Sequence, residues 1–262
     1  MTSTGGRLVA CLTWKVHCPA PVMSDVRPNN MNHAKPKLSC HPARLVRHDG
    51  GTSSFGGEAA HEGTQPADWK QPLHLVATLD AASEFFPLEV YPHATLPLYY
   101  PFASSSPLLQ YRVKSDYEIE IIHVSCFQLD TRPMIETTLL PPFQADLVAF
   151  SYVEARAIAL SSAFPSYELL PEDKRYIEDS EAYTSVMTGV NLRTFQGDIS
   201  HTCRNRHCQS FDRTTTLNIF CIVPCSRELA PDPHWGNYPK FVDLIFGLCP
   251  FCGTLVSLNV ST

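Results

Sequence analysis

Short apolar and alternating stretches recur along the middle and the end of the chain, and they have the length of β-strands. We predict strands at residues 73–79, 108–114, 117–129, 217–223, 241–246 and 254–260. Ser115 and Asp116 separate two of these stretches, which predicts a hairpin. Between residues 85 and 102 the chain contains four prolines, and this spacing favours edge strands and rigid turns.

A helical period replaces this pattern after the proline pair at residues 141–142, and Phe164-Pro165 marks its end. The positions that carry the period are Leu147, Phe150, Val153, Ala157 and Ile158. Asp146 would lie in the first turn, where a carboxylate interacts favourably with the helix dipole. A second, weaker helix is predicted from Glu172 to about Met187, with Gly189 ending it.

Residues 1–70 contain several glycine pairs and no sustained periodicity. Such a segment buries too little apolar surface to offset its conformational entropy, so we expect a mostly disordered tail. The predicted fold class is therefore α+β. It consists of a mixed strand and helix domain at residues 71–200 and a mainly β unit at residues 201–262.

Four cysteines near the end of the chain fall into two pairs. Cys249 and Cys252 are two residues apart, predicted strands flank them, and Gly253 follows. This spacing lets both sulfurs face one point, and glycine can take the positive φ that such a turn often requires. Cys203 and Cys208 form a second, wider pair. Forty residues lie between this pair and the pair of Cys249 and Cys252.

The Cys-Pro-Phe-Cys-Gly turn at residues 249–253 resembles the knuckle of zinc-ribbon and treble-clef-like zinc sites. The resemblance covers at most the region from residue 201 to the end. It implies a zinc ion held by Cys203, Cys208, Cys249 and Cys252. The wide spacing of Cys203 and Cys208 and the long separation between the two pairs depart from a minimal ribbon. Residues 230–239, which lie between the pairs, have the Pro, Gly and Asn content of an inserted loop.

Other residues compete for the same role. Cys221 lies in an apolar run, which favours a buried core residue, whereas Cys225 follows a proline and stays open as a ligand. His201 and His207 lie beside Cys203 and Cys208 in the sequence, and either could replace a cysteine. A redox dithiol would require Cys249 to open a helix, but a strand is predicted after it.

Composition and charge restrict the function classes. A hydrophobic content of 44% in 262 residues is sufficient for a sizeable core, and no apolar run is long enough to cross a bilayer. No persuasive secretory signal is evident, so we expect an intracellular protein, cytoplasmic or nuclear, with reduced thiols. Residues 71–262 carry twelve Lys and Arg against twenty-one Asp and Glu, a net charge of −9. This balance argues against broad nucleic-acid binding.

Three functional hypotheses follow. The first is a binding or scaffold module with a structural zinc ion and a protein partner. The second is an enzyme with an unrecognised active site, in which zinc is structural or is held by three ligands that include His201, His207 or His234. The third is a nucleic-acid contact through Arg204, Arg206 and Arg213. Motifs for phosphate loops, dinucleotide binding, nucleophile elbows and His-Glu-x-x-His metalloproteases are missing from the sequence.

Overall fold

The computed structural model describes residues 37–39, 41–67, 73–102, 108–125, 140–150, 185–189, 199–226, 229 and 242–261. Within these ranges the chain forms thirteen strands. They are β1 Ala43–Arg47, β2 Ser53–Phe55, β3 His74–Asp80, β4 Thr95–Tyr100, β5 Leu108–Ser115, β6 Glu118–Ser125, β7 Phe143–Ala149, β8 Met187–Thr188, β9 Ser200–Thr202, β10 Thr214–Thr216, β11 Asn218–Val223, β12 Val242–Leu248 and β13 Leu255–Ser261.

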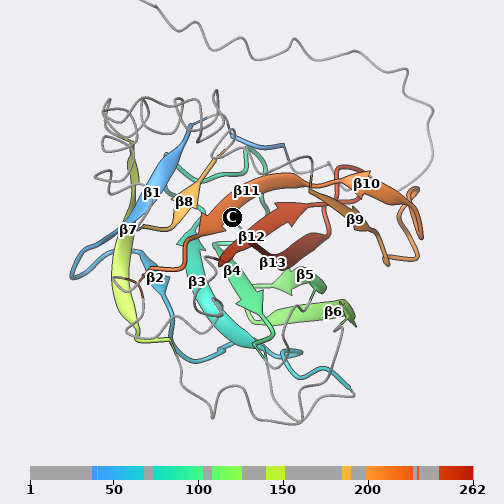
Figure 1. Cartoon of the computed structure of the whole chain (residues 1–262). Helices are drawn as coiled ribbons and strands as arrows, with labels where there is room; N and C mark the ends of the chain where they lie inside the picture. The colour runs from blue at the N-terminus through green and yellow to red at the C-terminus, as the bar shows by residue number, and fades with distance from the viewer. Residues whose placement is uncertain are drawn as a thin grey trace, which may run out of the picture. The chain divides into compact units, whose positions relative to one another are not determined.

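Eleven strands form one sheet in the order β4-β3-β2-β7-β1-β8-β11-β12-β13-β5-β6 (Figure 1). Every pair of neighbouring strands in it is antiparallel. β9 and β10 form a separate antiparallel pair, which leads directly into β11. The strands predicted near residues 73–79, 108–129, 217–223, 241–246 and 254–260 are confirmed as β3, β5 with β6, β11, β12 and β13.

The predicted α+β class is wrong, because the described part of the chain contains strands and no helix. The front of the first predicted helix is β7, whose buried residues Ala145 and Leu147 alternate with more exposed ones. β7 lies between β1 and β2, and both ladders fix it in an extended conformation. Residues 151–164 of that prediction lie outside the described residues.

Among the described residues, no helix is long and apolar enough to span a membrane.

The second predicted helix also requires correction at its end. Met187 belongs to β8, which pairs with β1 on one side and β11 on the other. A residue held between two ladders cannot also make helical hydrogen bonds. Gly189 follows this strand with a positive φ of 110°, so its conformational freedom ends a strand instead of a helix. Residues 172–184 lie outside the described ranges.

Part of the predicted disordered tail belongs to the sheet. β1 pairs with β7 and β8, and β2 pairs with β3 and β7. Ala43, Leu45 and Phe55 are buried, so this segment adds apolar surface to the common core. The predicted boundaries after residues 70 and 200 both fall inside this one sheet, and all described residues belong to the compact unit His33–Thr262. Residues 1–36 lie outside the described ranges.

The edge strand β4 packs against β5 and β13, which lie near the opposite edge of the sheet. The sheet therefore curls. The buried Tyr111 hydroxyl donates to the Pro97 carbonyl (2.8 Å) and accepts from the Tyr99 amide (3.2 Å). Ser257 on β13 donates to the Tyr99 carbonyl at 2.8 Å. Side chains therefore bind backbone groups of β4, an edge strand that contains a proline as expected.

Candidate metal centre

Two chain segments meet beside β5 and carry the four cysteines of the sequence prediction. One is the loop between β9 and β10, which contains Cys203 and Cys208. The other is the turn between β12 and β13, which contains Cys249 and Cys252. The ladder of β12 and β13 is in register from Val242 opposite Ser261 to Leu248 opposite Leu255, so the turn lies at the tip of a regular hairpin.

The backbone of the second segment closes a tight turn around its cysteines. The Gly253 amide donates to the Cys249 carbonyl, and the Cys249 amide donates to the Thr254 carbonyl, both at 2.9 Å. Gly253 has a φ of 68°, which is the left-handed conformation predicted from its place after the second cysteine. The local sequence therefore explains why two sulfurs project from the tip of this hairpin.

The first segment is held by consecutive backbone turns. The Cys208 amide donates to the Asn205 carbonyl and the Phe211 amide donates to the Cys208 carbonyl, both at 2.9 Å. The Asp212 amide then donates to the Cys203 carbonyl at 2.8 Å, and Asp212 has a φ of 58°. Asp tolerates this left-handed conformation better than most residues. The wider spacing of this pair is thus accommodated by an ordered loop that returns to β10.

The four sulfur atoms all lie within 4.8 Å of one another. The Sγ atoms of Cys203 and Cys252 are 3.7 Å apart, and those of Cys208 and Cys249 are 3.8 Å apart. These distances exceed the length of a disulfide bond, about 2.05 Å, so the four cysteines are free thiols. Cys203, Cys208 and Cys249 are buried, whereas Cys252 is half-buried. The cluster contains two sulfurs from each segment.

Hydroxyl and amide groups surround the sulfurs. The Ser210 Oγ atom is 3.1 Å from the Cys208 Sγ atom, and the Thr254 Oγ1 atom is 3.1 Å from the Cys252 Sγ atom. Asn205 Nδ2 donates to the Thr254 hydroxyl at 3.2 Å, and its Oδ1 atom accepts from the His207 amide at 3.1 Å. Asn205, Ser210 and Thr254 are buried. These polar groups supply hydrogen bonds to the thiols and also hold the two segments together.

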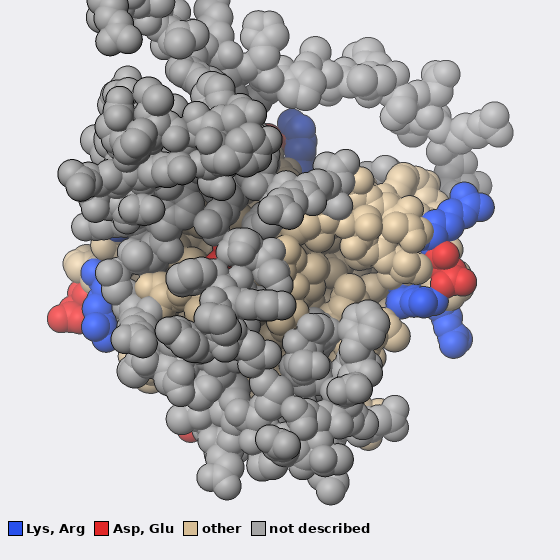
Figure 2. All heavy atoms as spheres, in the orientation of Figure 1, with Lys and Arg blue, Asp and Glu red and all other residues tan. Residues whose placement is uncertain are grey.

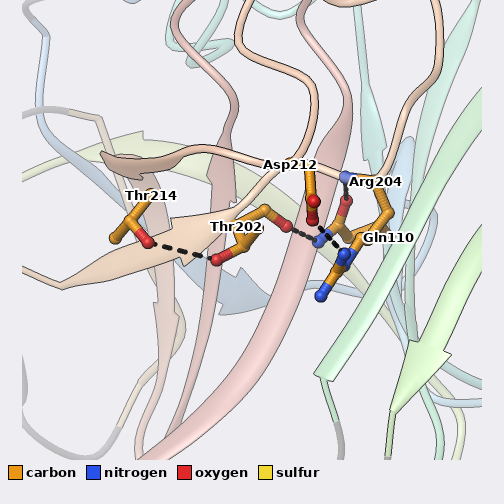
Figure 3. Close-up of polar contacts among 5 residues, drawn as sticks. All are labelled: Gln110, Thr202, Arg204, Asp212 and Thr214. Atoms are coloured by element: carbon orange, nitrogen blue, oxygen red, sulfur yellow. Dashed lines mark hydrogen bonds and ion pairs between the residues drawn. The ribbon is translucent and has the colours of Figure 1, made fainter.

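One side chain fastens the first segment to the main sheet. Gln110 on β5 is fully buried and donates from Nε2 to the Thr202 carbonyl, while its Oε1 atom accepts from the Arg204 amide, both at 2.8 Å (Figure 3). Figure 3 also shows the ion pair between Arg204 and Asp212 and the contact between the Thr202 and Thr214 hydroxyls. The loop that carries Cys203 is therefore fixed at its start by β5.

Hydrogen bonding and burial raise the pKa values of some thiols in the cluster and lower that of another. The hydrogen bond between Cys249 and Cys252 lowers the pKa of Cys252 and raises that of Cys249. Burial raises the pKa of the Cys203 thiol to about 12. Cys252 is therefore the thiol that this environment favours as a thiolate. The Cys203 and Cys249 thiols, whose pKa values are raised, would require a cation nearby in order to ionise at neutral pH.

The competing ligands of the sequence prediction lie elsewhere. Cys221 is buried in the main core, where burial raises its pKa well above the usual range, and Cys225 is half-buried against that core. His201 is buried, but its ring nitrogens are not among the clustered donor atoms, and His207 is exposed. His234 lies outside the described residues. Within the described ranges, the structure thus brings together the four predicted cysteines and none of these alternatives.

Sequence reasoning missed the polar residues that support the cysteines. Ser210 and Thr254 each stand two residues after a cysteine, and this spacing is the one signal that could have suggested them. Gln110 lies more than ninety positions before its partners Thr202 and Arg204, and no local pattern connects them.

Comparisons of the chain with protein-family models, with curated proteins and with solved structures found no match. The functional argument therefore depends on the site alone.

Proposed function

We propose that Cys203, Cys208, Cys249 and Cys252 hold one structural zinc ion, and that the protein is a binding or scaffold module. The observation that carries this proposal is the donor set, four thiols whose sulfurs lie within 4.8 Å of one another. Structural zinc sites are tetrahedral and prefer thiolate and imidazole ligands. A zinc ion also provides the positive charge that would favour ionisation of the buried thiols.

The sulfur separations agree with this geometry. A Zn–S bond of about 2.3 Å in a regular tetrahedron places the sulfurs about 3.8 Å apart. The separations of Cys203 from Cys252 and of Cys208 from Cys249 are 3.7 and 3.8 Å. These two contacts, each of which joins one segment to the other, therefore already have the separation that a bound zinc ion would require.

The placement of the cysteines supports a structural role for the ion. It would join the loop between β9 and β10 to the tip of the β12–β13 hairpin, with two ligands from each. β9 and β10 are three residues long and pair only with each other among the described strands. A hairpin of this size is marginal in water without further support. Zinc would supply that support through binding free energy that is released only in the folded arrangement.

The donor set also favours a binding role over catalysis at this centre. Four thiolates complete a tetrahedron and leave no position at which zinc could activate water. A three-ligand site completed by a histidine is not favoured, because neither His201 nor His207 contributes to the cluster. The residues of the chain would thus bind and orient the ion, while Ser210 and Thr254 would donate hydrogen bonds to its sulfur ligands.

Substitution of the metal by Co²⁺ tests this proposal. We expect the cobalt-loaded protein to show the strong visible bands of tetrahedral cobalt and the thiolate charge-transfer absorption of four sulfur ligands. Single Cys→Ser variants at the four positions should each reduce the charge-transfer intensity. Cys225→Ser is the matched control, because its thiol lies outside the cluster, and it should leave the spectrum unchanged. A five- or six-coordinate spectrum in the wild type would contradict the proposal.

A further inference from the structure

Exposed aromatic side chains lie on both segments that the cysteines bring together. Phe211 is 43% exposed and Phe251 is 37% exposed, and both are among the few large apolar side chains that the described surface exposes to this extent. Phe211 stands three residues after Cys208, and Phe251 stands two residues after Cys249. Because the sulfurs of Cys208 and Cys249 are 3.8 Å apart, the cysteine cluster fixes the relative positions of the two segments that present these rings.

Positive charge gathers on the same loop. Arg204, Arg206 and Arg213 are exposed, and Asp212 is the only acidic residue between Cys203 and Thr216. Asp212 forms an ion pair with Arg204, and within the described ranges Arg206 and Arg213 have no acidic partner. Figure 2 shows basic and acidic side chains together on the side of the molecule where Figure 1 draws β9 and β10. We call Arg206, Arg213, Phe211 and Phe251 the Arg–Phe face.

We propose that the Arg–Phe face binds a short acidic peptide segment of a partner protein that also carries an aromatic or aliphatic side chain. This inference depends on the proposed function, since the zinc ion would hold the two halves of the face together. Unpaired guanidinium groups fit carboxylates in bidentate geometry. Exposed phenylalanines offer the apolar contact that anchors a peptide, and aromatic and Arg residues are enriched at the centres of interfaces.

The charge distribution favours a short peptide over a nucleic acid. Residues 71–262 have a net charge of −9, so the basic face is a local exception on an acidic chain. A polynucleotide would extend beyond the few arginines of this face, and its further phosphates would find no concentrated basic surface on a chain of net negative charge. A short peptide can confine its carboxylates to the arginines. The acidic balance that argues against broad nucleic-acid binding therefore does not oppose this partner.

A randomised 12-residue peptide library displayed on phage tests the proposal, with the zinc-loaded full chain as bait. We expect the selected peptides to be enriched in Asp and Glu together with Trp, Phe or Leu. A labelled peptide from the selection should bind with lower affinity as salt increases, because exposed charges are screened. Failure to enrich any peptide, or enrichment of neutral or basic peptides, would overturn the proposal.

Two variants with matched controls locate the site. Arg206→Glu/Arg213→Glu should reduce the affinity for the labelled peptide about tenfold or more, and Phe211→Ser should reduce it about fivefold or more. Lys114→Glu reverses an exposed charge on β5, and Tyr117→Ser removes the ring of a 78% exposed residue in the β5–β6 turn. Both controls should leave peptide affinity unchanged. Equal losses in the variants and their controls would overturn the assignment to this face.

Two further readouts separate the alternatives. Single-stranded oligo(dT) of twelve nucleotides should bind more weakly than the selected peptide, and tighter binding would show that the face recognises nucleic acid instead. Zinc content is measured on every variant. A wild type that contains zinc but binds no peptide overturns only this inference, whereas a wild type that binds no zinc overturns the proposed function.

Discussion

At the scale of residues, the spacing of cysteines predicted which thiols come together, but not what surrounds them. Cys249 and Cys252 belong to a turn whose chemistry is local, and Gly253 takes the positive φ that the motif predicts. The partners of the sulfurs depend on contacts between two distant segments, such as the one between Asn205 and Thr254. Such contacts leave no periodic signal in the sequence.

The Thr254 hydroxyl tests whether these polar partners matter. Thr254→Val keeps the shape of the side chain but removes the group that contacts Cys252 and accepts from Asn205. An unsatisfied buried donor costs about 1–3 kcal/mol, so we expect the free energy of unfolding to fall by that amount. Zinc affinity should fall about 10- to 100-fold. Urea unfolding and competition with a chelator measure the two effects.

Thr214→Val is the matched control for this prediction. Thr214 is exposed, and among the described residues its hydroxyl contacts the hydroxyl of Thr202. We expect changes within about 0.5 kcal/mol, as for surface substitutions in general. If both variants behaved alike, the hydrogen bonds around Cys252 would not contribute to metal binding.

At the scale of elements, the strands near the end of the chain followed from sequence, whereas β7 did not. Leu147 and the apolar residues after it have helical spacing, yet within the described residues Leu147 belongs to the strand Phe143–Ala149. A seven-residue run is too short for periodicity alone to separate strand from helix. Pairing with β1 and β2 decides the conformation, and that pairing depends on residues almost a hundred positions earlier. For the same reason β1 and β2 carry no strong local signal.

Gln110 connects two elements, and its replacement tests whether β5 positions the first cysteine segment. Gln110→Leu would leave the Thr202 carbonyl and the Arg204 amide without their partner. We expect the free energy of unfolding to fall by about 1–3 kcal/mol, and zinc affinity to fall about tenfold or more. Urea unfolding of the zinc-loaded protein and chelator competition measure these changes.

Gln144→Leu provides the control for this variant. Gln144 is exposed on β7 and accepts from the Gly50 amide, far from the cysteines in the sheet order. It should leave zinc affinity unchanged. Wild-type zinc affinity in Gln110→Leu would refute the positioning role of Gln110.

At the scale of the whole molecule, segments assigned to three separate regions by sequence reasoning share one sheet. Composition suggested a disordered tail because β1 and β2 are short and glycine pairs at residues 50–51 and 56–57 flank β2. They gain stability from strands that follow much later, and no local window contains that information. The curl of the sheet also depends on distant contacts, notably those of Tyr111 with β4.

Tyr111→Phe tests the contribution of this curl to stability. The variant keeps the ring but removes the hydroxyl from the Tyr99 amide and the Pro97 carbonyl in a buried site. We expect a loss of about 1–3 kcal/mol in the free energy of unfolding, with zinc content unchanged. Tyr117→Phe removes the hydroxyl of a residue that is 78% exposed and should have no effect. Equal stability of the two variants would show that these hydrogen bonds are not required.

Acid should destabilise the protein through two half-buried histidines. Burial lowers the pKa values of His61 and His74 below the ordinary value of 6.5. The unfolded chain therefore binds protons at these positions more readily, and stability should decline as the pH falls below 6.5. The part of the decline that His61 and His74 cause should end once the pH passes their lowered pKa values in the folded state. Urea unfolding at a series of pH values measures this, and His74→Gln should reduce the slope. If His74→Gln left the pH dependence of the free energy of unfolding unchanged, His74 would not contribute to the acid destabilisation.

The most direct test of the account is the zinc content of the purified full chain, measured by elemental analysis beside the Cys249→Ser/Cys252→Ser variant. We predict close to one zinc ion per chain in the wild type, and loss of the ion together with a lower melting temperature in the variant. Cys225→Ser should retain both the metal and the melting temperature. A wild-type protein that contains no zinc when prepared without chelator would contradict the central claim, and the four thiols would then require another explanation.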